Sequence, residues 1–295
     1  MTLNAKQELH LTLQNDSQNI LPLLGQASGL SLGQIKKAIQ QGCLWHTKGQ
    51  STARLRRAKK SFKQGEQLHF YYNPEVLSQQ VEPAVMIAQG NDYSVWFKPY
   101  GMLCQGSKWS DHTTIARFVE THFQPQRPVY MVHRLDRATS GLMVLAHTKS
   151  MASRLAKSFE QRQTKKIYHA IVLGDIRPCL QGKPLLTLDT PVAGKSALSH
   201  IKVLAYDEAQ QRTKVAVQID TGRKHQIRLH LSSIGFPIVG DRLYGDANAS
   251  DLNLQLQSVY LCLPNIAQQN SQSDEHHKSL QPLEFHLPEA YHLRL

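Results

Sequence analysis

The stretch VHRLDRATSGLMVLAHT, residues 132–148, contains a single acidic residue, Asp136. Arg134 stands two residues before this acid, and Arg137 follows it directly. The small residues TSG favour a turn, and the apolar run LMVLA after them favours a buried strand. The sequence therefore places one carboxylate between two cations at the entrance of a buried strand. A nearby guanidinium favours the charged form of a carboxylate, so this arrangement suits an acid that has to stay ionised.

Segments on either side of this strand mix helical and strand patterns without a regular alternation of the two. Strands are expected within 93–104, 165–174 and 213–220, and helices within 112–123 and 150–163, the last with Ser150 as its N-cap. This mixture is typical of an α+β domain. We therefore expect a mostly antiparallel or mixed β-sheet flanked by helices over residues 83–295.

The stretch TGRKHQIRLHLSSIGFP, residues 221–237, fits two kinds of structure. Alternate residues are apolar, as in a strand, but the spacing of Ile227, Leu231 and Ile234 is also helical. A glycine and a proline directly after this spacing are a helix stop. The pattern therefore predicts a turn and then a helix from about Lys224 to Ile234.

The first eighty residues are strongly basic. No Asp or Glu occurs from Ser17 to Gly65. A charge of one sign over such a length attracts phosphates, although a solvated basic face is the alternative interpretation. The cations expected to contact RNA are Lys36, Lys37, Arg54, Arg56, Arg57, Lys59 and Lys60.

The order of elements in this basic region is a helix, a basic loop and a strand. The helix is expected over 31–42, where Ser31 and Gln34 fit a capping box and Gly42 can take a left-handed stop. A loop is expected at 49–52, and an alternating strand after the turn at Gln64-Gly65. Over about residues 22–72 this order resembles the alpha-L motif, a small RNA-binding domain first found in a ribosomal protein. The resemblance implies a small N-terminal α/β RNA-binding domain. The proline-containing stretch 73–85 is interpreted as a linker, so this domain and its linker are expected at 1–82.

Four motifs after the linker occur in a fixed order: KPYGM, HRLDRATSGLMVLAHT, KKIYHAIVLG and TGRKHQIRLHLSSIGFPIVGDRLYG. Together with GKSALSHIKVL at 194–204 they resemble the pseudouridine synthases of the large family that modifies ribosomal and transfer RNA. The matches span roughly residues 95–246. Tyr100, the stretch LCQGS and Lys224 depart from the family's pattern, which affects substrate choice more than chemistry.

The resemblance implies a role for several residues. Asp136 would be the catalytic aspartate, and Arg228 would pair with it. Arg134 would face the RNA where the target nucleotide is flipped out of its stack. Tyr168 would stack on the target base, worth about 1–3 kcal/mol, and take part in proton transfer. Ile227 would pack against the base or against Tyr168. Without the resemblance, Tyr168 is an ordinary half-buried strand tyrosine, Ile227 a core residue and Arg228 a cap on a neighbouring strand.

Pseudouridine formation breaks the bond between the ribose and N1 of uracil and joins C5 of the same base to the sugar. No atom is added and no electron leaves, so neither a cofactor nor a metal is expected. An ionised carboxylate is needed as nucleophile or base. It can attack the ribose carbon, attack the uracil ring or remove a ribose proton, and the residue types leave these three mechanisms open.

Charge and composition agree with an RNA partner. Lys and Arg total 34 against 22 Asp and Glu, a formal net charge of +12, which favours a polyanion. We expect a cytoplasmic monomer without a signal peptide or membrane span, acting on ribosomal RNA, with transfer RNA as the second possibility. Two other functions remain: RNA binding without catalysis, and metal-dependent RNA hydrolysis. Scattered histidines, with His276-His277 in a polar loop and His225 and His230 five apart, disfavour the hydrolase.

Overall fold

The computed structural model describes residues 5–58, 61–246, 251–264 and 281–295. These residues form two compact units, one of residues up to Val81 with Gln105–Phe118, the other of Glu82–Cys104 with Val119–Leu295. The chain therefore passes between the units at three places, which a single linker at 73–85 does not account for. Lys59, Lys60, His276 and His277 lie outside the described residues.

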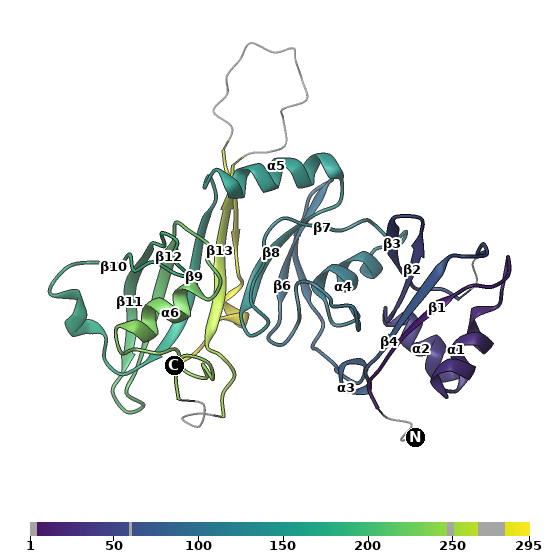
Figure 1. The fold of residues 1–295 in the computed structure, drawn as a ribbon. Coiled ribbons are helices and arrows are strands. Elements are labelled where there is room, and N and C mark those ends of the chain that lie inside the picture. The colour runs from purple at the N-terminus through teal and green to yellow at the C-terminus, as the bar shows by residue number, and fades with distance from the viewer. Residues whose placement is uncertain (1–4, 59–60, 247–250, 265–280) are drawn as a thin grey trace, which may run out of the picture. The chain divides into compact units, whose positions relative to one another are not determined.

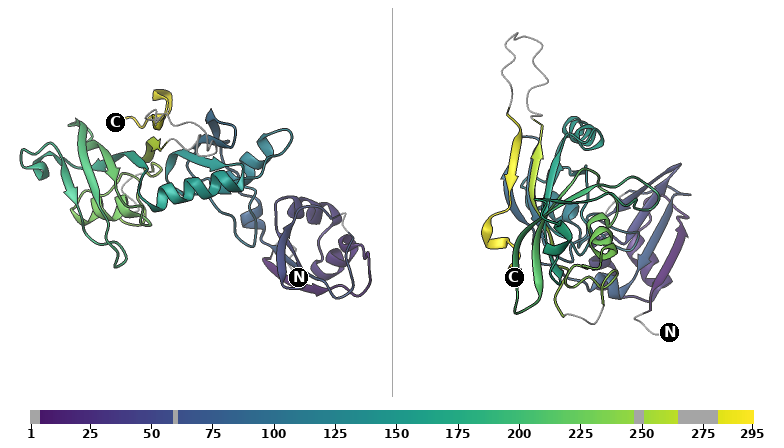
Figure 2. Two further views of the ribbon diagram at one scale, coloured as in Figure 1. Left: turned by 90° about the horizontal axis from the view of Figure 1, so that it is seen from above. Right: turned by 90° about the vertical axis from the view of Figure 1, so that its left-hand side faces the viewer.

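The first unit contains a four-stranded antiparallel sheet in the order β1-β4-β2-β3 (Figure 1). Its elements are β1 (Gln7–Thr12), α1 (Ile20–Ser28), α2 (Leu32–Gln40), β2 (Leu44–Lys48), β3 (Ser51–Leu55), β4 (Gln67–Tyr72) and α3 (Pro74–Leu77). Both α1 and α2 pack on one face of the sheet, where Leu24 and Ile35 share a core with Leu68 and Phe70 (Figure 2).

Local sequence signals decide several boundaries in this unit. The capping box of Ser31 and Gln34 is confirmed, and Gly42 has the predicted left-handed backbone, with φ of 89°. The loop expected at 49–52 is wrong in its second half, because Ser51 and Thr52 pair with Lys48 and Thr47 in a hairpin. The stretch expected to be a linker contains a helical turn, α3.

The second unit is built on one ten-stranded mixed sheet. Its strands are β5 (Val85–Gln89), β6 (Tyr93–Lys98), β7 (Tyr130–Met131), β8 (Ser140–Ala146), β9 (Lys165–Leu173), β10 (Leu186–Leu188), β11 (Ser199–Asp207), β12 (Arg212–Ile219), β13 (Leu256–Leu263) and β14 (Leu283–His286). The order is β10-β11-β12-β9-β13-β8-β6-β5, with β14 beside β13 and β7 beside β8. The β13–β8 pair is parallel, whereas the other pairs in this sheet are antiparallel. The predicted α+β class with a mostly antiparallel, mixed sheet is confirmed.

The helices that accompany this sheet begin and end close to the predicted residues. They are α5 (Lys149–Glu160), α6 (Gln226–Ser233) and the second half of α4 (Ile115–His122), which begins in the first unit, with short 3-10 turns at Arg177–Leu180 and Glu289–Tyr291. The N-cap of α5 is Thr148, whose hydroxyl accepts from the Met151 amide, and Ser150 lies inside the first turn. The helix predicted from Lys224 starts at Gln226, because His225 has a left-handed backbone with φ of 58°.

The strand β8 is the centre of the second unit. Its apolar residues Leu142, Val144 and Ala146 pack against Met151 and Leu155 of α5. At its start, Gly141 lies opposite Ser258 of β13 with φ of 115°, and a Cβ atom there would stand 2.2 Å from the Ser258 carbonyl oxygen. Only glycine allows this close approach. The TSG turn therefore brings the chain directly from Asp136 into the interior of the sheet.

Candidate active site

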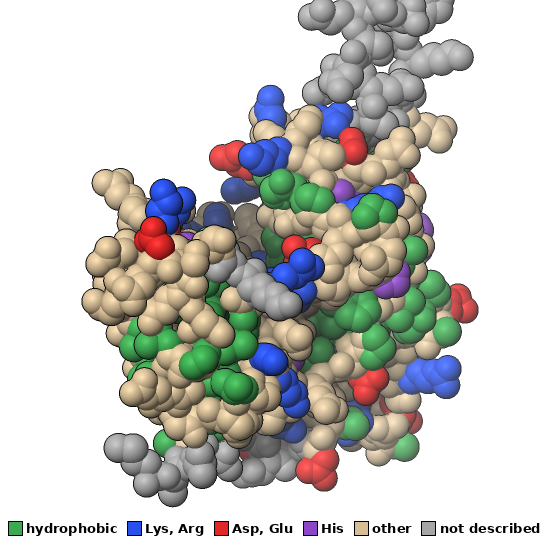
Figure 3. All heavy atoms as spheres, turned by 90° about the vertical axis from the view of Figure 1, so that its right-hand side faces the viewer, with side chains coloured by type: hydrophobic (Ala, Val, Ile, Leu, Met, Phe, Trp, Pro, Cys, Tyr) green, Lys and Arg blue, Asp and Glu red, His purple; other side chains and the backbone are tan. Residues whose placement is uncertain are grey.

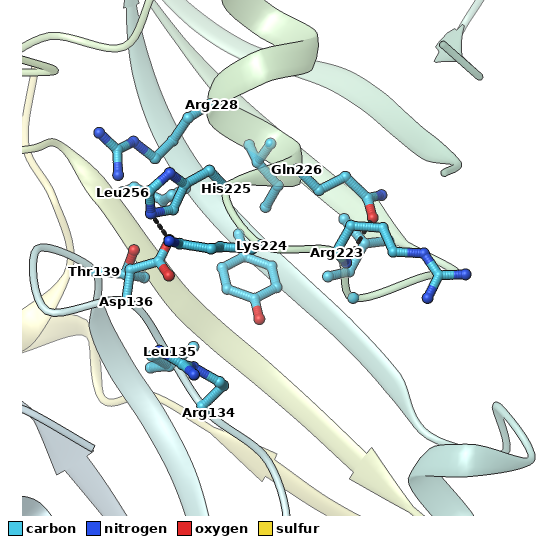
Figure 4. Close-up of a pocket in the computed structure, with 14 residues that line it drawn as sticks. Arg134, Leu135, Asp136, Thr139, Arg223, Lys224, His225, Gln226, Arg228 and Leu256 are labelled. Atoms are coloured by element: carbon cyan, nitrogen blue, oxygen red, sulfur yellow. Dashed lines mark hydrogen bonds and ion pairs between the residues drawn. The ribbon is translucent and has the colours of Figure 1, made fainter. Parts of the chain in front are cut away.

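A cavity of about 150 Å³ opens where the loop before β8, the strand β9 and the start of α6 meet (Figure 4). It brings together Arg134, Asp136, Tyr168, Ile227 and Arg228, which lie far apart in the sequence. The remaining lining residues are Leu135, Thr139, Ile219, Gly222, Arg223, Lys224, His225, Gln226 and Leu256. Among the described residues of this lining, Asp136 is the one acid, beside four cations.

The loop that carries Asp136 is anchored from the interior of the unit. The side chain of Lys98 is fully buried, and its Nζ donates to the carbonyl oxygens of Pro99, Met102 and Arg137 at 3.1, 2.9 and 3.4 Å. Burial lowers the pKa of Lys98 to about 8, although Cys104 and Asp136 oppose this shift. The buried lysine therefore ties the turn that follows β6 to Arg137, the residue directly after Asp136.

The side chain that faces the Asp136 carboxylate is a histidine that the sequence did not single out. His225 Nε2 lies 3.6 Å from Asp136 Oδ2, and both side chains are mostly buried (Figure 4). On its other side, His225 Nδ1 lies 2.8 Å from the hydroxyl of Tyr244. Burial lowers the pKa of His225, and Asp136 opposes this shift. A neutral imidazole therefore faces the carboxylate at neutral pH.

Arg228 has a different partner from the one expected. Its Nε and Nη2 donate to the two carboxylate oxygens of Asp241 at 2.8 and 2.6 Å, and both side chains are buried. Asp241 also accepts from the amides of Leu243 and Tyr244. The expected direct pairing of Arg228 with Asp136 is therefore wrong. Burial lowers the pKa of Arg228, but the hydrogen bonds and charge of Asp241, and then the charge of Asp136, raise it.

Tyr168 and Ile227 are buried and contribute to the cavity wall. Tyr168 is 8% exposed and comes from β9, and Ile227 is 5% exposed and comes from α6. Burial, and next the charge of Asp136, raises the pKa of Tyr168. The phenol therefore stays protonated over the whole neutral range, and its hydroxyl can donate a hydrogen bond inside the cavity.

The turn before α6 is held by Gln226, another residue whose role the sequence did not indicate. Its Oε1 accepts from Thr221 Oγ1 and the Arg223 amide, at 2.7 and 3.1 Å. Its Nε2 donates to the Leu198 carbonyl oxygen and to Ser199 Oγ, at 2.9 and 3.0 Å. All the hydrogen-bonding capacity of the buried amide is thus used to shape the turn that carries Arg223, Lys224 and His225.

Comparison with known proteins identifies the family of this chain. A family described as RNA pseudouridylate synthase matches residues 92–233. The dual-specificity RNA pseudouridine synthase RluA of Escherichia coli is 34% identical over 215 residues, which cover 68% of this chain and 94% of that protein. This chain belongs to the RNA pseudouridine synthase family. It is thus similar in sequence to enzymes that isomerise uridine in RNA.

Two further proteins resemble this pseudouridine synthase. The ribosomal large subunit pseudouridine synthase D of Pseudomonas aeruginosa is 41% identical over 126 residues, covering 39% of this chain and 38% of that protein. The solved structure of human RNA pseudouridylate synthase domain containing 1 covers 72% of this chain and 86% of its own, with a TM-score of 0.57 and 22% identity. At that identity the likeness concerns the fold.

A second cavity, of about 430 Å³, adjoins the first in this synthase. The two share Arg134, Tyr168, Ile219, Gly222 and Arg223. The second adds Arg162, Lys166 and the aromatic ring of Phe159, on which His133 stacks with 4.6 Å between ring centres. Its four Lys and Arg side chains outnumber its two acids, Glu160 and Asp220. The surroundings of the candidate site are therefore basic.

The cations expected to contact RNA in the first unit of the synthase divide into two groups. Arg54 and Arg56 form ion pairs with Asp111, and Arg54 also donates to the Ser107 carbonyl oxygen. Lys36, Lys37 and Arg57 are exposed. On the face in Figure 3, Lys and Arg side chains are dispersed among hydrophobic and uncharged ones.

The described ranges of the chain contain no group of three His, Cys, Asp or Glu side chains that could hold a metal ion. None of the helices in this part of the chain has the length and apolar character that crossing a membrane requires.

Proposed function

We propose that this synthase converts specific uridines of structured RNA to pseudouridine with Asp136 as its catalytic carboxylate. One observation carries the proposal: Asp136 is the sole acid among the described residues that line the cavity. Four cations, Arg134, Arg223, Lys224 and Arg228, share this lining. Cations nearby favour an ionised carboxylate, and they also suit the phosphates on either side of a flipped nucleotide.

The isomerisation needs little beyond this constellation. The bond from C1′ of the ribose to N1 of uracil breaks, the detached base turns, C5 forms the new bond to C1′ and loses its proton, and N1 takes up a proton. Asp136 acts as the nucleophile or as the base that removes a ribose proton, and both roles need the ionised form. The Tyr168 ring supports the flat base, and its protonated hydroxyl donates to a base oxygen. Ile227 closes the apolar side of the base.

The substrate we propose is ribosomal RNA of the large subunit. The similarity to a relative named ribosomal large subunit pseudouridine synthase D supports it. The relative named dual-specificity RNA pseudouridine synthase makes transfer RNA the second candidate. The first unit binds RNA outside the target site through its exposed cations Lys36, Lys37 and Arg57, and the synthase works as a monomer in the cytoplasm without a cofactor.

Tritium release from C5-labelled uridine tests the proposal. Purified synthase, in buffer containing EDTA, is incubated with unmodified transcripts of large-subunit ribosomal RNA and of transfer RNA. We expect release from the ribosomal transcript, and mapping of pseudouridines in a deletion strain then identifies the position. Release from transfer RNA alone would overturn the proposed substrate, whereas an active Asp136→Asn variant would overturn the proposed catalytic residue.

A further inference from the structure

Three polar side chains form a row that ends at the candidate catalytic carboxylate. The hydroxyl of Tyr244 lies 2.8 Å from His225 Nδ1, and His225 Nε2 lies 3.6 Å from Asp136 Oδ2. The two ring nitrogens therefore face two different partners. Nothing in the chemistry above uses Tyr244 or His225, although both lie beside the reacting group.

The row is attached to rigid parts of the second unit. His225 directly precedes α6, and its left-handed backbone, with φ of 58°, directs the ring. Tyr244 is held through its backbone, because its amide donates to Asp241 Oδ1 at 3.1 Å and its carbonyl oxygen accepts from Ser232 Oγ at 2.6 Å. The Arg228 guanidinium lies 5.0 Å from the centre of the Tyr244 ring. The buried Arg228–Asp241 pair thus holds Tyr244, the member of the row farthest from Asp136, in place.

The hydrogen-bonding capacity of these groups selects one arrangement of protons. A carboxylate accepts only, a neutral imidazole has one donor and one acceptor, and a tyrosine hydroxyl can do either. Both contacts are favourable when Tyr244 donates to Nδ1 and the Nε2–H of His225 points at Asp136. The other charged groups that act on His225 are Lys224, Arg228 and Asp241. Two cations and burial disfavour a second proton on the ring, which keeps this neutral form.

We propose that His225, fixed by Tyr244, is a positioning residue that aims the Asp136 carboxylate at the reacting nucleotide through its Nε2–H. The inference rests on the proposed role of Asp136. The separation of 3.6 Å is longer than a hydrogen bond, so the proposed role requires the Asp136 carboxylate to move closer to Nε2. His225 touches neither base nor ribose in this role; it restricts the orientations that the carboxylate can take.

Two substitutions of His225 test separately the contact of Nδ1 with Tyr244 and the contact of Nε2 with Asp136. Asparagine tolerates a left-handed backbone and keeps a polar group near Nδ1, but it is too short to reach Asp136. Glutamine is long enough to place its amide near Nε2. For His225→Asn we expect kcat to fall about 10- to 100-fold at saturating RNA, the effect of one hydrogen bond to a charged group. For His225→Gln we expect kcat within about threefold of wild type, and for both variants an unchanged KM and RNA affinity.

Tyr244→Phe provides a second test, because this substitution removes the hydroxyl that contacts His225 and keeps the ring. We expect kcat to fall about three- to tenfold, and the double variant Tyr244→Phe/His225→Asn to match His225→Asn alone, since both act through the same contact. Wild-type kcat in His225→Asn, or fully additive effects in the double variant, would overturn the inference. Equal losses in the Asn and Gln variants with the same melting temperature would overturn it too. Asp136→Asn tested beside them separates the two proposals: if it is inactive and His225→Asn is not impaired, only the positioning role fails.

Discussion

The Arg228 guanidinium donates two hydrogen bonds to the Asp241 carboxylate, at 2.6 and 2.8 Å, in a buried and bidentate pair. Among the described residues Arg228 therefore pairs with Asp241 and not with Asp136, and the side chain that faces the Asp136 carboxylate is His225, at 3.6 Å. Arg228 acts on Asp136 through its charge rather than through a hydrogen bond. The Arg228–Asp241 pair thus has a structural role that is separate from the catalytic role proposed for Asp136.

Because the Arg228–Asp241 pair is buried, we expect Asp241→Asn to lower the free energy of unfolding strongly. Removal of one member of a buried ion pair leaves the other charge uncompensated, which costs about 3–5 kcal/mol. We expect a correspondingly lower urea midpoint, measured by circular dichroism. Asp175→Asn is the control, because Asp175 pairs with Arg177 at an exposed site, and its loss should leave the midpoint unchanged. Equal midpoints for the two variants would show that the buried pair contributes no stability.

Asp136→Asn should abolish tritium release and leave the protein folded. Because Arg228 keeps Asp241 as its partner, the buried guanidinium does not lose its carboxylate, and the melting temperature should change little. RNA affinity should also stay close to wild type, since asparagine has nearly the same size. A variant that still converts uridine at the wild-type rate would return Asp136 to a structural role.

Tyr168→Phe and Tyr168→Ala distinguish two contributions of the tyrosine. The phenylalanine variant keeps the ring and loses the hydroxyl, whereas alanine loses both. If stacking on the base dominates, the phenylalanine variant should stay near wild type, and alanine should lose about 1–3 kcal/mol of binding to the target nucleotide. The dependence of the single-turnover rate on RNA concentration measures the difference. Equal and severe losses would instead assign proton transfer to the hydroxyl.

The stability of the second unit should fall in mild acid because of His133. Its Nε2 accepts from the Val144 amide at 3.0 Å, and burial, and next the charge of Lys166, lowers its pKa from 6.5 to about 3. Below pH 6.5, the pKa of histidine in the unfolded chain, the unfolded chain binds a proton at His133 that the folded chain does not bind. Each such group therefore removes up to about 1.4 kcal/mol of stability per pH unit as the pH falls from 6.5 towards 3.

His133→Gln tests this pH dependence, because glutamine can accept from Val144 but does not titrate. Urea unfolding between about pH 7.5 and pH 5 should show a shallower loss of stability in the variant than in wild type. Some slope should remain, since burial also lowers the pKa of His169, to about 4. Identical slopes in variant and wild type would mean that His133 is not protonated on unfolding in this range.

The exposed cations of the first unit predict a change in the salt dependence of RNA binding. In Lys36→Gln/Lys37→Gln/Arg57→Gln, the slope of log affinity against log salt should fall by about 2–3 units on duplex RNA if each cation neutralises one phosphate. The control carries the same change of charge at the exposed residues Lys183, Lys195 and Lys202, and its slope measures the effect of net charge alone. Equal slopes for the two triple variants would exclude specific phosphate contacts in the first unit.

Local signals made much of the fold predictable. The alternating and apolar patterns identified β8, β9 and β12, and capping residues identified α2, because these features depend on neighbours in the chain. The ordered motifs also brought Asp136, Tyr168 and Arg228 into one expected site. The sequence could not show which of the neighbouring side chains contact Arg228 and Asp136. Asp241 and His225 both stand in motifs that were noticed, but only the three-dimensional arrangement shows that one takes Arg228 and the other faces Asp136.

The ion pairs of Arg54 and Arg56 with Asp111 limit where the chain of the synthase can be truncated. Asp111 belongs to a segment that follows Cys104 in the chain but folds into the first unit. A truncation that removes residues 1–81 therefore leaves this carboxylate without either arginine and leaves Gln105–Phe118 without the sheet it folds with. The first unit is for this reason not an exchangeable module, and graft or deletion at residue 81 alters the polypeptide that remains.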